Sequence, residues 1–285
     1  MFRERQPTLP PELEEIVFSL CLRNDWNNAR GLFLVAKRVY QWLIPQFYAV
    51  AIFHPNKIKG RRPRYTTRSL VHHGKHVRHM LLYNSTSANE TGLYDTVEHC
   101  LSLCPNLQNV AMWTIEHRFE VLRKVVDRLV SLPHLTHLSI ELRTLDSVIN
   151  HYCPTVPTFE HVTHLELLQL GQLAYPRIID GSFPALTHLS LDGLTSSSAD
   201  PIEVALRHWK DRLKVVIWFL GEEGTDCLPE VIETSEYTSL NDPRVVILTY
   251  GSHYATTWNE GAEGGMGIWR TAEEVVKRRR RVASS

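Results

Sequence analysis

The stretch that decides the fold is LTHLSI at residues 135–140, because close variants of it return as VTHLEL at 162–167 and LTHLSL at 186–191. Looser versions of the same apolar-x-x-apolar-x-apolar pattern begin at residues 47, 77, 107, 213 and 245. The last two apolar positions of each unit are two residues apart, which places them on one face of a β-strand. The repeat therefore predicts a series of equivalent strands.

The segments between these strands have the apolar spacing of helices. Apolar residues recur every three or four positions from Phe119 to Leu132, from Tyr94 to Leu103 and from Ile202 to Trp209. Units of strand and helix that cannot bury their apolar faces alone stack side by side. We therefore predict an α/β solenoid with a parallel concave sheet and convex helices. The alternative is a doubly wound α/β domain, which has the same element order but no reason to repeat its strand sequence.

The repeated segments resemble the leucine-rich repeat family, whose strand signature is L-x-x-L-x-L. The resemblance covers about Phe47 to Tyr250, although most units lack the Asn or Cys that follows the strand in that family. It implies that the concave strand face is a surface for binding other proteins.

The N-terminal residues form a separate helical pattern. Leu9-Pro-Pro-Glu-Leu13 opens an amphipathic helix, since prolines and acidic residues both suit a helix start. We predict a second helix that begins near Ala29. The opening motif, together with Leu34-Val-Ala-Lys-Arg38 and Trp42, resembles the F-box-like family, in which leucine-rich repeats frequently follow the F-box. The tail from Gly267 to Val276 resembles that of many fungal F-box-like proteins.

The F-box resemblance implies a contact with a Skp-type adaptor, and through it with a cullin–RING ubiquitin ligase, while the repeats select the protein substrate. We assign residues 1–46 to an all-α F-box-like module and residues 47–285 to the repeat domain, with a C-terminal capping helix near Trp269. The alternative is a repeat scaffold without a ligase link, whose N-terminal helices only cap the stack. The residues expected to contact the adaptor are Leu9, Pro10, Glu12, Leu13, Ile16, Val17, Leu34, Val35 and Trp42.

Four histidines and an asparagine share one position of the repeat. Neighbouring strands lie ~4.8 Å apart, so their side chains would form a column on the concave face. We interpret the column as solvated, because no carboxylate or thiolate recurs beside it; the alternative is a pH-sensitive or metal-binding face. The residues expected to contact a partner on this face are His79, Asn109, His137, His164, Glu166 and His188.

Composition argues against several classes of protein. Lys plus Arg and Asp plus Glu both number 31, so no net charge favours nucleic acid. The five cysteines include no CxxC pair, which predicts free thiols in a reducing compartment. We find no apolar run of ~18 residues and no signal peptide, so we expect no membrane partner and a place in the cytoplasm or nucleus. The basic run Lys277–Arg281 is either a solvated helix end or a nuclear signal.

No motif of catalysis is present: we find no G-x-S-x-G, P-loop, H-E-x-x-H or G-x-G-x-x-G after a strand. We therefore expect a protein-binding function with no enzymatic activity and no cofactor or metal. A third alternative is a hydrolase on an α/β sheet, which requires a deep pocket with titratable groups at the carboxyl ends of strands.

Overall fold

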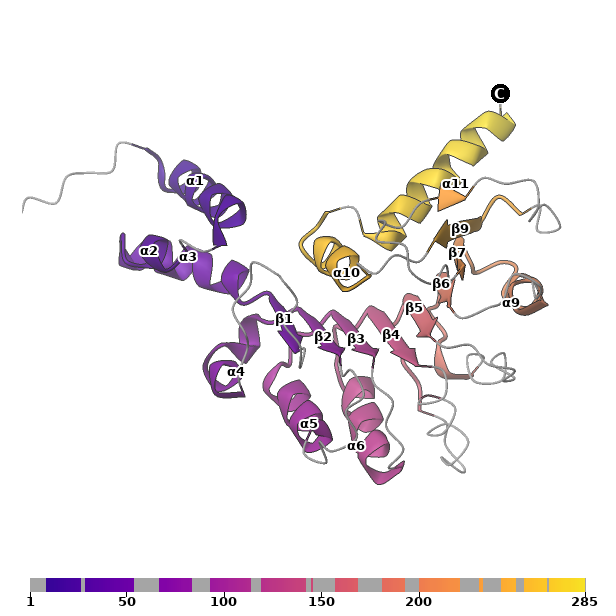
Figure 1. The fold of residues 1–285 in the computed structure, drawn as a ribbon, viewed down its shortest axis with the longest axis horizontal. Coiled ribbons are helices and arrows are strands. Elements are labelled where there is room, and N and C mark those ends of the chain that lie inside the picture. Colours follow the sequence, from indigo (N-terminus) through magenta and orange to yellow (C-terminus); the bar gives the residue numbers. More distant parts are fainter. Residues whose placement is uncertain are drawn as a thin grey trace, which may run out of the picture.

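The fold consists of a central sheet with helices on both faces and three further helices before it (Figure 1). The structure, a computed structural model, describes residues 9–26, 29–53, 67–83, 93–113, 119–141, 145, 157–168, 181–192, 200–220, 231–232, 242–249, 254–265 and 267–284. The helices are α1 (Pro11–Asn24), α2 (Ala29–Phe33), α3 (Lys37–Phe47), α4 (Thr67–His73), the 3₁₀ helix η2 (Gly74–His76), α5 (Leu93–Leu103), α6 (Phe119–Val130), α9 (Asp200–His208), α10 (Tyr254–Ala262) and α11 (Ile268–Ser284). The strands are β1 (Val50–Phe53), β2 (His79–Tyr83), β3 (Asn109–Trp113), β4 (His137–Glu141), β5 (His164–Leu168), β6 (His188–Leu191), β7 (Val215–Leu220), β8 (Val231–Ile232) and β9 (Val245–Thr249).

The described strands form one nine-stranded sheet in which the parallel strands, β1 to β7 and β9, follow the order of the chain. The spatial order is β1-β2-β3-β4-β5-β6-β7-β9-β8, and only the short β8 is antiparallel to its neighbour. A doubly wound sheet reverses its strand order at a switch point. This sheet has no such reversal, so the doubly wound alternative is wrong.

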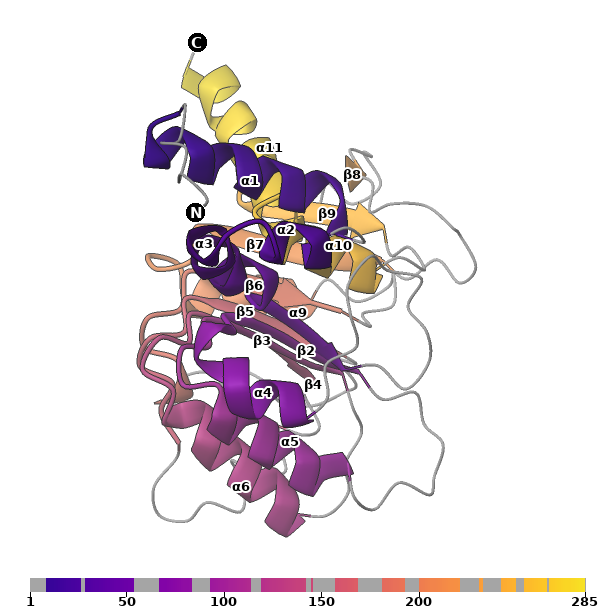
Figure 2. The same cartoon turned by 90° about the vertical axis from the view of Figure 1, so that its left-hand side faces the viewer.

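The two faces of the sheet are covered by different helices (Figures 1 and 2). On the α5–α6 face, apolar strand residues and helix residues such as Leu101 and Val125 form the main core. On the opposite face, which we call the α11 face, Ile217, Phe219 and Val246 pack against α11. Alternate residues of each strand point to opposite faces, so both faces are built from the same short segments.

The predicted repeat is confirmed in the centre of the sheet. The middle apolar position of each unit pairs with its counterpart in the next strand, and every one of these residues is at most 2% exposed. The paired residues, in strand order from β2 to β7, are Met80, Val110, Leu138, Leu165, Leu189 and Val216.

The predicted phase of the repeat is wrong at both ends. In β1 the partner of Met80 is Ala51, so Val50 and Ile52 do not occupy the core positions that the pattern assigned to them. In β9 the partner of Val216 is Val245. The pattern had assigned Val245 to the first apolar position of its unit, three residues before the middle position that corresponds to Val216. An odd shift in register moves each side chain to the opposite face of the sheet. These end strands are apolar at consecutive positions, so the pattern alone could not select the register.

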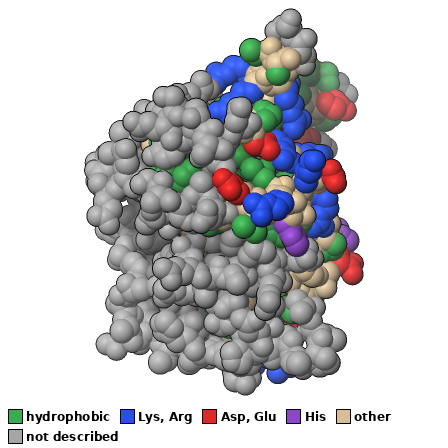
Figure 3. All heavy atoms as spheres, turned by 90° about the vertical axis from the view of Figure 1, so that its right-hand side faces the viewer, with side chains coloured by type: hydrophobic (Ala, Val, Ile, Leu, Met, Phe, Trp, Pro, Cys, Tyr) green, Lys and Arg blue, Asp and Glu red, His purple; other side chains and the backbone are tan. Residues whose placement is uncertain are grey.

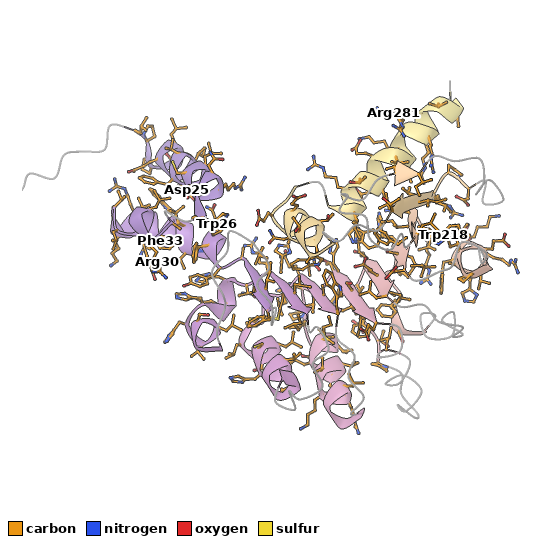
Figure 4. The ribbon with its side chains drawn as sticks, viewed as in Figure 1. Asp25, Trp26, Arg30, Phe33, Trp218 and Arg281 are labelled. Atoms are coloured by element: carbon orange, nitrogen blue, oxygen red, sulfur yellow. The ribbon has the colours of Figure 1, made fainter. Side chains whose placement is uncertain are left out.

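The second predicted N-terminal helix is two helices. The backbone of Ala36 is extended (φ −161°, ψ 153°), and this separates α2 from α3. Leu22, Val39 and Leu43 are fully buried between the three helices. Trp26 and Phe33, labelled in Figure 4, each place their ring 5.1 Å from that of Phe47. The N-terminal helices therefore have a small core of their own.

The C-terminal helix α11 carries the apolar face predicted for it, but not in the predicted place. Ala272, Val275 and Val276 are buried and Trp269 is partly buried. The helix packs across the α11 face beside β7 and β9, rather than closing the end of the stack. Among the helices that the structure describes, none combines the length and the apolar character that a bilayer crossing requires.

We predict that Gly74→Ala destabilises the chain, because a β-carbon at this buried position would overlap the backbone carbonyl of Leu103. The expected loss is about 1–3 kcal/mol or more, as for other overpacked sites. Gly31→Ala is the matched control, since nothing lies within 4 Å of its β-carbon and Ala favours a helix. Thermal unfolding measures both; equal midpoints for the two variants would contradict the packing of η2 against α5.

Candidate functional site

Three histidine rings are stacked across the α11 face at the start of β4, β5 and β6. His137, His164 and His188 are neighbours in register, and His79 and Asn109 continue the column on β2 and β3. Adjacent rings among the three lie 4.0 Å apart, with interplanar angles of 14° and 10°. The column of side chains expected from the repeat is thus present, and its central part is a tight stack.

A threonine fixes the orientation of each stacked ring. The hydroxyls of Thr136, Thr163 and Thr187 lie 2.8–2.9 Å from Nδ1 of the histidine that follows. Each hydroxyl also lies 3.2–3.3 Å from a backbone carbonyl of the preceding strand unit. The hydroxyl can donate to that carbonyl while it accepts Nδ1–H, or it can donate to Nδ1. In both cases Nδ1 is engaged and Nε2 points away from the backbone.

The stacked histidines are uncharged at neutral pH. Burial lowers the pKa of His137 to about 4, and burial followed by the charges of His137 and His188 lowers that of His164 to about 2. Burial, together with Lys214, lowers the pKa of His188 to about 4. The interpretation of the column as solvated is therefore wrong: His188 is 7% exposed and the other two rings are half-buried.

A buried carboxyl group lies two residues further along the strand than the histidine, on the same face of the sheet. Glu166 is 2% exposed on β5, and burial raises its pKa to about 8, against a hydrogen bond from Ser139 that lowers it. The indole of Trp113 donates to the hydroxyl of Ser139 at 2.8 Å. Oε1 of Glu166 has no hydrogen-bond partner among the described residues. At neutral pH this carboxyl group is largely protonated.

Helix α11 covers one end of the histidine stack. The ring of Trp269 meets those of His164 and His188 edge to face, at 5.2 and 6.0 Å. Oε1 of Glu273, one turn further along, lies 3.3 Å from Nε2 of His188. The repeat pattern could not predict this carboxylate, because Glu273 comes from a helix 85 residues after His188 and outside the repeat.

A cavity of about 320 Å³ continues from the stack under the turn between α10 and α11. Its walls include His79, Asn109 and Glu166 from the strands, and Trp258 and Trp269 from the helices. The strand residues lie at the amino-terminal ends and in the middle of β2–β5. The cavity therefore does not meet the condition set by the hydrolase alternative, which needs titratable groups at the carboxyl ends of strands.

Two glycines allow the turn above the cavity to be tight. A β-carbon at Gly267 would lie 2.8 Å from Cα of Gly261, and one at Gly261 would lie 3.1 Å from Cα of Gly267. The first distance is too short for a β-carbon at Gly267, and the second would be a tight contact at Gly261. The close crossing of α10 and α11 thus depends on this pair of glycines.

The residues assigned to adaptor binding lie at the other end of the molecule. Leu13, Ile16 and Val17 form the outer side of α1, and Leu9, Pro10 and Glu12 precede them, also exposed. Leu34 and Val35 are exposed in the turn before α3. Trp42 differs from the others, because it packs partly against the small N-terminal core.

The cysteine and basic segments behave as ordinary parts of the fold. Burial raises the pKa of Cys100 to about 11 and that of Cys104 to about 12, so both are inert thiols in the core. Figure 3 shows Lys and Arg side chains along the part of the surface that carries α11. Most of Lys277–Arg281 is exposed there, but Arg279 Nη1 donates to the carbonyl of Val245 at 2.5 Å and so ties α11 to β9.

A scan against protein-family models finds no matching family, and a search of curated proteins finds no significant match. The geometry of the histidine stack, Glu166 and the cavity is thus the ground for any assignment of this face.

We predict that Glu166→Gln raises the melting temperature more at pH 8.5 than at pH 5. The pKa of Glu166 in the folded chain, about 8, lies above its value in the unfolded chain. The wild-type chain therefore loses stability as the pH rises from 5 to 8.5. The amide carries no such penalty, and the difference should grow by at least about 1 kcal/mol, or roughly 2–4 °C. Glu160→Gln, at an exposed position, should give no pH-dependent difference, and parallel pH profiles for Glu166→Gln and wild type would contradict the burial of this carboxyl group.

We predict that His164→Asn makes the chain less sensitive to acid. The folded pKa of His164 is depressed, so the unfolded state binds more protons and the wild-type chain loses stability as pH falls below about 6.5. The variant should start from a lower melting temperature at pH 7.5, since it lacks the stack, but should lose less on going to pH 5. His161→Asn, an exposed control, should keep the wild-type slope. An unchanged slope in His164→Asn would show that the ring is hydrated.

Proposed function

We propose that this chain is a protein–protein interaction module, the substrate-receptor subunit of a cullin–RING ubiquitin ligase of the SCF type. In this proposal α1–α3 are an F-box-like module that binds a Skp-type adaptor. The sheet and its helices are a leucine-rich-repeat-like solenoid that holds the protein substrate.

The observation that carries the proposal is the apolar outer surface of the N-terminal helices. Leu13 is 49% exposed, Ile16 54% and Leu34 86%, with Leu9, Val17, Leu20 and Val35 also exposed around them. A helix that only capped the repeats would turn such residues toward the end of the sheet. Contiguous exposed apolar side chains are typical of surfaces that bind another protein.

The remaining sides of the three helices are fixed, which makes the outer surface a preformed one. Leu22 of α1 and Leu43 of α3 are fully buried together. The guanidinium of Arg38 donates two hydrogen bonds to the carboxylate of Glu14, at 2.8 and 3.0 Å. The end of α3 makes contact with α4: the ring of Phe47 lies 5.1 Å from that of Tyr48, and Tyr48 stacks on His73 at 3.9 Å. Helix α3 therefore acts as the cap, and the exposed apolar side of α1 is available to bind a partner.

The arrangement of the sheet supports the repeat assignment. Parallel strands in chain order, with α5 and α6 between successive strands on one face, are what stacked strand–helix units produce. The face for the substrate is narrower than the repeat pattern implied, because α11 covers His164 and His188. A substrate side chain would reach His79, Asn109, His137 and Glu166 through the cavity under the α10–α11 turn.

We predict that Leu13→Asp weakens binding to a purified Skp-type adaptor by at least about 100-fold, because a carboxylate would be buried without a partner in the interface. Its circular dichroism spectrum should match that of wild type, since the side chain is half-exposed in the free protein. Val71→Asp, which changes an exposed apolar residue of α4 in the same way, should bind like wild type.

Biolayer interferometry with immobilised adaptor measures the three affinities. Wild-type affinity in Leu13→Asp would overturn the assignment of α1. Absence of binding by the folded wild-type chain would leave the repeat scaffold without a ligase link as the better account.

A further inference from the structure

Three potential metal ligands converge where α11 crosses the histidine stack. One ring nitrogen each of His164 and His188 and a carboxylate oxygen of Glu273 all lie within 4.8 Å of one another. The distance between His188 Nε2 and Glu273 Oε1 is 3.3 Å. Two ligand atoms that each lie ~2.1 Å from one tetrahedral ion are about 3.4 Å apart. The closer pair therefore already has the spacing of ligands that share an ion.

From this juxtaposition we propose that His164, His188 and Glu273 form a Zn²⁺ site that joins β5 and β6 to α11. Two imidazoles and one carboxylate are a donor set that suits zinc, and a water molecule would complete four-coordination. Ca²⁺ and Mg²⁺ prefer sites made of oxygen atoms alone, so this set disfavours them.

The threonines that precede the two histidines hold the rings in an orientation that suits metal binding. Metal-ligating histidines bind through one nitrogen while the other donates a hydrogen bond that orients the ring. Thr163 and Thr187 provide acceptors at 2.9 and 2.8 Å from Nδ1, and each hydroxyl can pass its own hydrogen to a backbone carbonyl. Nε2 is then free for the ion. Because both rings are neutral at pH 7, zinc would not have to displace protons from them.

To bind an ion, the His164 ring must change its orientation within the stack. The rings of His164 and His188 are nearly parallel, so their Nε2 lone pairs run side by side rather than to one point. The last torsion of a histidine side chain is soft, and a turn of the His164 ring toward α11 would bring its lone pair to the ion. Glu273 is 49% exposed and can follow, whereas the exposed Lys214 is the nearby charge that opposes a cation.

The other histidine cluster lacks this convergence. The rings of His72, His73 and His76 are separated by 6.3 and 6.5 Å, and His73 is stacked on Tyr48. Among the described residues, the group with Glu273 is where three ligand atoms come together.

The experiment uses the full chain, stripped with EDTA, desalted and titrated with ZnCl₂ against a chromophoric chelator at pH 7.5. We expect one zinc ion per chain and a higher melting temperature in its presence, since an ion that binds only the folded state stabilises it. Glu273→Gln keeps the size of the side chain on an exposed position and should weaken zinc binding at least 10-fold, with loss of the thermal shift. Glu274→Gln is the matched control: it removes the same charge from the next residue of α11 and should bind zinc like wild type.

His188→Asn should weaken zinc binding as Glu273→Gln does, and Glu273→Gln decides the matter if His188→Asn does not fold. Absorption of the Co²⁺-substituted chain should lack the thiolate charge-transfer band, which excludes the cysteines as ligands. Zinc binding of equal strength in wild type and Glu273→Gln would overturn the proposal, as would failure of the folded wild-type chain to bind zinc. Neither outcome depends on the adaptor, so the test is independent of the proposed function.

Discussion

The parallel hydrogen-bond ladder from β2 to β7 is the constraint on which the rest of the structure depends. Its register places equivalent residues of successive units side by side, with Met80, Val110 and Leu138 on one face and Asn109 and His137 on the other. One face thereby becomes a continuous apolar layer for α5 and α6. The other face gains a column of polar side chains, four histidines and Asn109, from β2 to β6, because a parallel ladder in register repeats whatever the sequence repeats.

The same ladder explains why the histidines have unusual properties. A single histidine on a strand would be hydrated, but three in register at 4.0 Å exclude water from one another's faces. Each ring then depends on the threonine before it for a polar contact at Nδ1. The Thr-His pair, repeated three times, is therefore one structural unit, and the depressed pKa values of its rings follow from their packing.

The sequence predicted the centre of this fold well and its ends poorly, for physical reasons. Units at 77, 107, 135, 162 and 186 were placed in their true register because a histidine, or Asn109, precedes the middle apolar residue and marks the other face. The unit at 213 was also placed correctly, although β7 is apolar throughout. β1 and β9 are apolar on both faces, and a pattern cannot choose between two apolar faces. Part of the site could be predicted from the sequence, because the histidine column and Glu166 follow from the repeat. Glu273, Trp269 and the glycine crossing belong to helices whose position over the sheet is decided by tertiary packing, as for the apolar side of α11 on Ile217 and Phe219.

The two ends of the molecule are suited to different partners. The N-terminal helices present an exposed apolar surface over a small buried core, while the α11 face presents a cavity with neutral polar groups and tryptophan walls. Hydrogen–deuterium exchange of the full chain, with and without a Skp-type adaptor, tests this separation most directly. The account predicts slower exchange in peptides from residues 9–35 and no change in those from β3 to β6. Protection of β3 to β6 with none at residues 9–35 would contradict it.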